Sequence, residues 1–63
     1  MTAFEKWVEV FEVTEWRDGA VFRTKSLGHQ WVDADTTAGD GIIWAAPTEA
    51  PDEGDLTFRK AKR

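Results

Sequence analysis

The stretch from Phe4 to Trp16 constrains the fold of this chain more than any other segment does. It places seven large apolar side chains in thirteen residues and separates them almost only by charged residues. No other segment is long enough to form the central element of a sheet or of a small core. We therefore expect the rest of the chain to pack around this stretch.

This stretch fits two secondary-structure patterns. The i, i+3, i+4, i+7 spacing of an amphipathic helix is matched by Phe4, Trp7, Val8 and Phe11. Residues 7 to 16 are instead rich in valine and tryptophan, which favour the pleated surface of a strand. Apolar residues stand at even positions up to Val10 (Val8 and Val10) and at odd positions directly after it (Phe11 and Val13). A β-bulge near Val10 would account for this change in the alternation. We favour a strand, with a helix over residues 4–11 as the alternative.

The dipeptide Asp18-Gly19 predicts a β-hairpin, because glycine accepts the positive φ angle that tight hairpin turns require. The first stretch would then pair antiparallel with Ala20–Ser26. A two-residue loop predicts four cross-strand pairs: Arg17 with Ala20, Trp16 with Val21, Val13 with Thr24, and Glu12 with Lys25. A three-residue loop with Gly19 in a bulge would shift every partner by one.

Three further strands are predicted after the hairpin. Leu27-Gly28 indicates a turn before a short strand at His29–Val32. The polar loop Asp33–Gly41 leads to an apolar strand at Ile42–Ala46, and an acidic connection with two prolines precedes a last strand at Leu56–Lys60. Five short strands with few helix signals predict an all-β fold, an antiparallel sheet that is curled or closed as a small barrel. An α+β fold with one short helix is the second choice.

The 63 residues predict one domain, residues 1–63, near the lower size limit for a chain that folds alone. Without cysteine, neither a disulfide nor a thiolate zinc site can add stability. We expect the four Trp and four Phe residues to fill the core, since one aromatic side chain buries roughly 150–250 Å². No apolar run is long enough for a membrane span and the start does not resemble a secretory signal, so we expect a cytoplasmic protein.

Charge is divided between an acidic body and a basic C-terminal tail, which we place at residues 58–63. Residues 1–58 hold all 12 acidic and four basic residues, a net charge of 4 − 12 = −8, and the last five residues hold the other four bases. Such asymmetry bears on solubility and on the choice of partner rather than on fold.

The chain offers little for catalysis or metal binding. A nucleophile and its base must lie within hydrogen-bond reach, and the single serine and histidine, Ser26 and His29, are expected at a turn and on the surface. The loop that starts at Asp33 resembles a calcium loop, but Ala38 and Trp44 occupy the places that need glycine and glutamate. We expect no enzymatic activity, no metal site and no cofactor.

The remaining features indicate binding, because an exposed tryptophan rimmed by carboxylates is typical of an anchor at a protein interface. We predict a non-enzymatic interaction module, a regulator or inhibitor of the kind that phages and other mobile elements encode. Its acidic face would dock on a basic protein partner, for example a nucleic-acid-binding protein. We expect a monomer or homodimer with no membrane contact.

Two alternatives to this interpretation remain. One is a small barrel that binds single-stranded nucleic acid through its tryptophans and its basic tail. The other is a structural subunit that self-associates through its sheet edges. The predicted acidic face comprises Glu5, Glu9, Glu12, Glu15, Asp33, Asp35 and Asp40. The predicted aromatic anchors are Trp7, Trp16, Trp31 and Trp44, which the sequence does not sort into core and surface.

Overall fold

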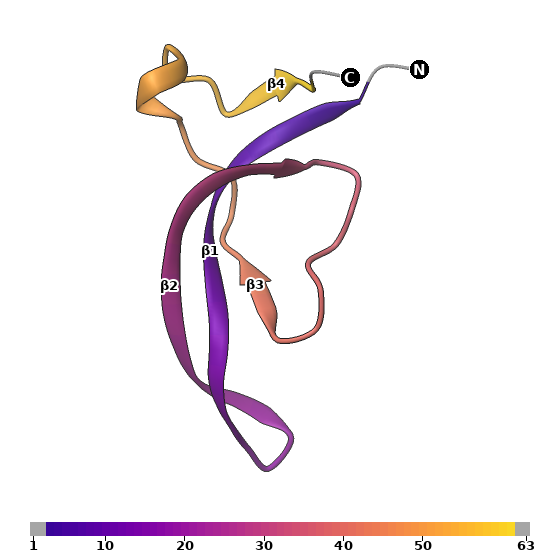
Figure 1. Ribbon diagram of the computed structural model, residues 1–63, viewed down its shortest axis with the longest axis vertical. Helices are drawn as coiled ribbons and strands as arrows, with labels where there is room; N and C mark the ends of the chain where they lie inside the picture. The colour runs from indigo at the N-terminus through magenta and orange to yellow at the C-terminus, as the bar shows by residue number, and fades with distance from the viewer. Residues whose placement is uncertain (1–2, 62–63) are drawn as a thin grey trace.

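The computed structural model describes residues 3–61 as an antiparallel sheet built on one long hairpin (Figure 1). Strands β1 (Phe4–Arg17) and β2 (Ala20–Asp33) form the hairpin, and both β3 (Ile42–Trp44) and β4 (Phe58–Lys60) pair with β1. A short 3₁₀ turn, η1 (Pro51–Glu53), lies between β3 and β4. Within residues 3–61 there is no α-helix, and thus none that could cross a membrane. The predicted all-β class is confirmed.

The sheet is curled but does not close into a barrel. Its strand order is β2-β1-β3, and β4 pairs with the same edge of β1 as β3 does. The hairpin bends into an arc around β3 (Figure 1). The radius of gyration is 13.3 Å, compared with about 10.6 Å for a compact chain of this length. The molecule is therefore elongated and leaves much apolar surface outside its core.

The hairpin turn is the predicted Asp18-Gly19 turn, with φ angles of 52° and 80° at its two residues. Two positive φ angles in a two-residue loop match the twist of the flanking strands. All four predicted cross-strand pairs are present in the ladder between β1 and β2. The two strands also carry compensating bulges, because Phe22 on β2 and Thr14 on β1 are both skipped by the register. Because each strand has one extra residue, the two bulges compensate for each other, and the cross-strand register is the same on both sides of them.

The predicted turn at Leu27-Gly28 is wrong, because β2 runs through it without a break. Val10 pairs with Gly28 and Phe11 with Ser26, so Leu27 is the extra residue of a β-bulge. Gly28 has a φ of 91°, which a bulge can require as much as a turn does. The bulge lies beside Val10, where the change of apolar parity predicts one, although the extra residue is on the partner strand.

As a result, the predicted second and third strands form the single strand β2, and residues 3–61 form a sheet of four strands rather than the predicted five. The two C-terminal strands are also shorter than predicted. The third strand ends at Trp44 rather than Ala46, and the last begins at Phe58 rather than Leu56. Leu56 forms an isolated bridge with Ala50 instead, which closes the loop that contains η1.

We expect the substitution Gly28→Val to destabilise the protein by about 1 kcal/mol or more, because a β-branched residue resists a positive φ angle. Space is not the reason, since no heavy atom lies within 4 Å of an added Cβ at this position. Gly39→Val is the matched control, because Gly39 also has open space and lacks the positive φ. Thermal unfolding should show a lower melting temperature for Gly28→Val alone. An equal loss in both variants would contradict the bulge.

The core is small and consists of valines. Val8, Val10 and Val32 are buried, and Ile42 and Trp44 pack against them. Because Val32 pairs with Lys6, it lies on the same face of the sheet as the other even-numbered residues of this part of β1. The expectation that tryptophan and phenylalanine fill the core is therefore wrong, since the largest fully buried side chain among the described residues is Val8.

The outer edge of β2 has no strand paired to it within residues 3–61. Two bulges interrupt this edge, at Phe22 and at Leu27, and Arg23 and Lys25 lie between them. Bulges and basic residues are both features that disfavour edge-to-edge pairing. The open edge thus lends little support to self-association through the sheet.

Candidate functional site

The far end of the hairpin extends beyond the third strand as a two-stranded ribbon (Figure 1). Strand β3 pairs with β1 only from Val10 to Glu12, and the Val13 N–H then donates to the carbonyl oxygen of Gly41 at 2.8 Å. Beyond this point, residues 14–24 consist of β1, β2 and their turn alone. We call residues 14–24 the hairpin arm. An isolated two-stranded ribbon is marginally stable in water, so its side chains have to hold it together.

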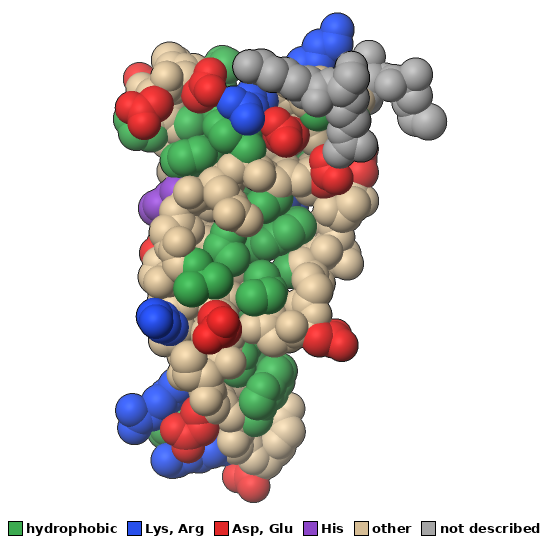
Figure 2. Space-filling model, in the orientation of Figure 1, with side chains coloured by type: hydrophobic (Ala, Val, Ile, Leu, Met, Phe, Trp, Pro, Cys, Tyr) green, Lys and Arg blue, Asp and Glu red, His purple; other side chains and the backbone are tan. Residues whose placement is uncertain are grey.

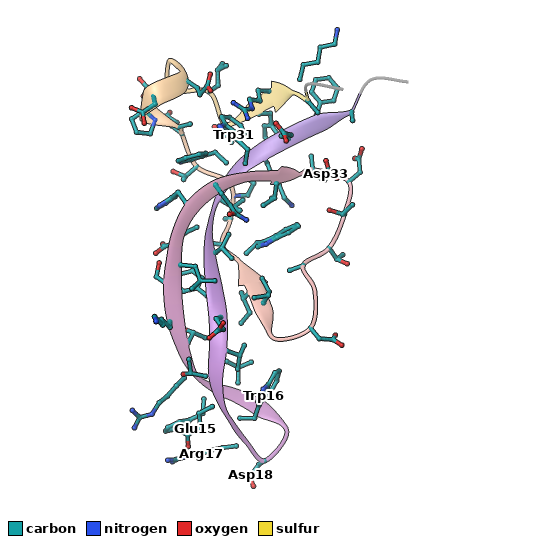
Figure 3. The ribbon with its side chains drawn as sticks, viewed as in Figure 1. Glu15, Trp16, Arg17, Asp18, Trp31 and Asp33 are labelled. Carbon is teal, nitrogen blue, oxygen red and sulfur yellow. The ribbon has the colours of Figure 1, made fainter. Side chains whose placement is uncertain are left out.

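The front face of the hairpin arm is apolar. Trp16 and Val21 are cross-strand partners, and they are 57% and 42% exposed. Trp16 is the most exposed tryptophan within residues 3–61, whereas the other three are half-buried. Figure 3 shows Trp16 on one side of the ribbon and Glu15 and Arg17 on the other. We call the side that carries Trp16 the front face and the opposite side the back face.

Acidic residues lie at both ends of the hairpin arm. Glu12 precedes the arm on β1, and Asp18 lies in the turn at its end. Asp40 directly precedes Gly41, whose carbonyl oxygen is bound to β1 at the base of the arm. Among the described residues these three carboxylates form no ion pair. Figure 2 shows the apolar area at this end of the molecule with acidic side chains above and below it.

The back face holds a cluster of four side chains, which we call the Phe22 cluster: Glu15, Arg17, Phe22 and Arg23. The carboxylate of Glu15 accepts from Nε of Arg17 at 2.9 Å and lies 3.1 Å from Nε of Arg23. The guanidinium carbon of Arg17 lies 3.6 Å from the ring centroid of Phe22, and that of Arg23 lies 5.6 Å from it. The predicted acidic residue Glu15 is thus neutralised by two arginines.

The tryptophans of the body are largely occupied by contacts within the chain. Trp7 and Trp31 have ring centroids 5.3 Å apart, and His29 stacks on Trp7 at 5.8 Å. The guanidinium carbon of Arg59 lies 4.3 Å from the ring centroid of Trp31. The third body tryptophan, Trp44, packs on the valine core, with Nζ of Lys6 at 5.2 Å from its ring centroid. Of the four predicted anchors, Trp16 alone is exposed on the described surface, and the other three are half-buried.

Two more of the predicted acidic residues have partners in the body of the sheet. Glu5 accepts from Nε of Arg59 at 2.9 Å, and Nη1 of the same arginine donates to Glu53 at 2.6 Å. Glu9 accepts a hydrogen bond of 2.6 Å from the hydroxyl of Ser26. The predicted basic tail therefore begins inside the fold, because Arg59 belongs to β4 and ties that strand to β1.

The remaining predicted acids lie in the loop between β2 and β3. Asp33 and Asp35 line an open depression of about 180 Å³ together with Ala3, Phe4 and Thr36. No group of three or more metal-ligating side chains occurs in the part of the chain that the structure describes. The seven predicted acidic residues do not form one continuous face, and those next to the arm are Glu12 and Asp40.

Ser26 and His29, the candidate nucleophile and base, have different partners. The Ser26 hydroxyl donates to Glu9 and accepts from the backbone N–H of Gly28 at 3.2 Å. His29 stacks on Trp7. Ser26 thus lies inside β2 beside the bulge rather than at the predicted turn, whereas His29 lies on the surface as predicted.

The hairpin arm combines an exposed aromatic side chain with an ion-paired back face, and Glu12, Asp18 and Asp40 at its two ends form no ion pair within residues 3–61. Sequence reasoning did not single out the Phe22 cluster, although the two adjacent large apolar residues Val21 and Phe22 break the alternation of β2 and signal the bulge. Function has to be inferred from these side chains. No protein-family model, no curated protein and no solved structure matches this chain.

Proposed function

We propose that this protein is a non-enzymatic interaction module that docks on a basic protein partner through the front face of its hairpin arm. The observation that carries the proposal is Trp16, 57% exposed at the end of a ribbon that has no third strand. More than half of an indole leaves on the order of 100 Å² of apolar surface in water, and burying it would contribute roughly 2–3 kcal/mol. A protein interface is the setting in which such a side chain acts as an anchor.

The charges around the arm support a basic partner. Glu12 and Asp40 lie at the base of the arm and Asp18 at its tip, and none of them forms an ion pair among the described residues. Lys25, opposite Glu12, offsets only part of this charge. Carboxylates around an apolar centre steer a basic partner into contact and disfavour an acidic one. A nucleic-acid-binding protein is a concrete candidate, because its basic surface binds phosphates and the carboxylates of this chain would stand where the phosphates lie.

Binding of single-stranded nucleic acid has less support. A stacking platform needs open aromatic faces, whereas Trp7 and Trp31 contact each other and are flanked by His29 and Arg59. Arg59 is also bound to two carboxylates, which reduces the positive charge it offers to a phosphate. Affinity for nucleic acid comes mainly from neutralised phosphates, and residues 3–61 carry more acidic than basic side chains.

Photo-cross-linking tests the proposal. A photoreactive phenylalanine analogue is placed at position 16 or, as a control, at position 4, whose exposed Phe4 lies at the other end of the molecule. In an extract of the source cells, we expect an adduct with a basic protein from position 16 only. The adduct should also form in an extract treated with nuclease before irradiation, and its yield should fall when irradiation is done at about 0.5 M salt, because exposed charges are then strongly screened. Equal adducts from both positions, or adducts lost with nuclease, would contradict the proposal.

A second variant separates the proposal from nucleic-acid binding. Lys60, Lys62 and Arg63 are replaced by serine while Arg59 is kept, because Arg59 holds β4 through Glu5 and Glu53. We expect the cross-link from position 16 to be unchanged. If this variant loses an oligonucleotide complex that the full chain forms, the proposal is wrong.

A further inference from the structure

We infer that Phe22 is a positioning residue, which holds the back of the hairpin arm in one conformation and thereby keeps Trp16 on the front face. This inference rests on the proposed function, because it explains how the anchor is presented to a partner. It concerns the Phe22 cluster, which itself makes no part of the front face.

The position of Trp16 follows from that of its two neighbours in the chain. Successive side chains of a strand point to opposite faces, so Glu15 and Arg17 share the back face. They are joined to each other at 2.9 Å, and Arg17 lies against the ring of Phe22 at 3.6 Å. With both neighbours held at the back, the indole of Trp16 is directed to the front.

The bulge in β2 makes this cluster possible. In an uninterrupted strand, Phe22 and Arg23 would lie on opposite faces. Because the register skips Phe22, Arg23 pairs with Glu15, and both the ring and the second guanidinium reach the back face. The compensating bulge at Thr14 then restores the register toward the body. The bulge therefore places the ring of Phe22 on the same face as Arg17 and Arg23, whereas in a regular strand Phe22 and Arg23 would lie on opposite faces.

The contacts of the cluster are individually weak, because Arg17 and Arg23 are more than half exposed. They act, however, on a segment that has no third strand to hold it and that is itself marginal. Weak contacts of this kind affect local opening of the arm rather than unfolding of the whole chain. The effect to be measured is thus the mobility of Trp16, and not the melting temperature.

Nuclear magnetic relaxation on the free protein tests the positioning role. In the wild type we expect a backbone order parameter near 0.85 at Trp16, as in a rigid strand, and a value below about 0.6 in Phe22→Leu. Phe22→Tyr keeps the ring and should restore the order, whereas leucine keeps only apolar bulk. Phe58→Leu is the matched control, since Phe58 is about as exposed (52% against 47%) and lies in β4. An unchanged order parameter in Phe22→Leu would overturn the inference.

Binding kinetics then connect the order of the arm to docking. The protein captured from position 16 serves as the probe, with purified wild type and Phe22→Leu. If only about a tenth of the arms present Trp16 correctly, the apparent Kd should rise about tenfold. We expect the tenfold rise in Kd to come from a slower association rate, with the dissociation rate unchanged. The association rate should return to the wild-type value in Phe22→Tyr. A disordered arm that still associates at the wild-type rate would overturn docking through the arm, whereas an ordered arm would overturn the role of Phe22.

Discussion

Replacing Val8 with aspartate is expected to unfold the protein. Val8 is 0% exposed and lies at the centre of the valine core. A carboxylate buried there without a partner costs several kcal/mol. The total stability of a 63-residue domain is only about 3–9 kcal/mol. Circular dichroism should therefore show no cooperative thermal transition for Val8→Asp at neutral pH.

The control for this experiment is Val21→Asp. Val21 is also a strand valine, but it is 42% exposed on the hairpin arm, so its aspartate stays in contact with water. Its melting temperature should change by no more than a few degrees. The milder variant Val8→Ala should remain folded and lose roughly 2 kcal/mol, because it removes two methyl groups from a packed site. Cooperative unfolding of Val8→Asp near the wild-type temperature would show that the core is misplaced.

Trp16→Ala is expected to weaken binding of the captured partner about 100-fold while leaving the melting temperature unchanged. Truncating a buried anchor at an interface costs about 2–4 kcal/mol, and each 1.4 kcal/mol is a factor of ten in Kd, so a loss of about 2.8 kcal/mol corresponds to about 100-fold. The loss should appear as faster dissociation, since an anchor acts after docking. Stability should be unaffected because the indole lies outside the core. Titration with the purified partner and thermal unfolding measure the two quantities.

Leu27→Ala is the control for Trp16→Ala, because Leu27 is similarly exposed but belongs to the bulge in the body of β2. Its affinity should match that of the wild type. Charge reversal at Glu12, Asp18 or Asp40 should slow association more than it speeds dissociation, because charges at a rim mainly steer the encounter. Equal losses in Trp16→Ala and Leu27→Ala would mean that binding does not use the arm.

Much of the fold depends on local signals and could be predicted from the sequence. The turn at Asp18-Gly19 needs positive φ angles, and few residues other than glycine accept them readily. Once that turn is placed, the pairing of β1 with β2 follows by counting along the two strands, and the four predicted pairs are present. The parity change after Val10 likewise indicated the bulge beside it. The all-β class follows from these short-range patterns.

Only the tertiary structure decided that Gly28 belongs to a bulge and not to a turn. A bulge and a turn can both require a positive φ at glycine, and the strand pairing of Gly28 with Val10 distinguishes them. The same holds for the candidate site. Four tryptophans look alike in the sequence, but β3, β4 and η1 return along β1 and leave Trp16 outside the covered part of the sheet. Arg59 reaches Glu5 across 54 positions of sequence, and Glu15 meets Arg23 through a bulge. Which charges stay free and which aromatic side chain stays exposed depends on such long-range contacts, and no local pattern encodes them.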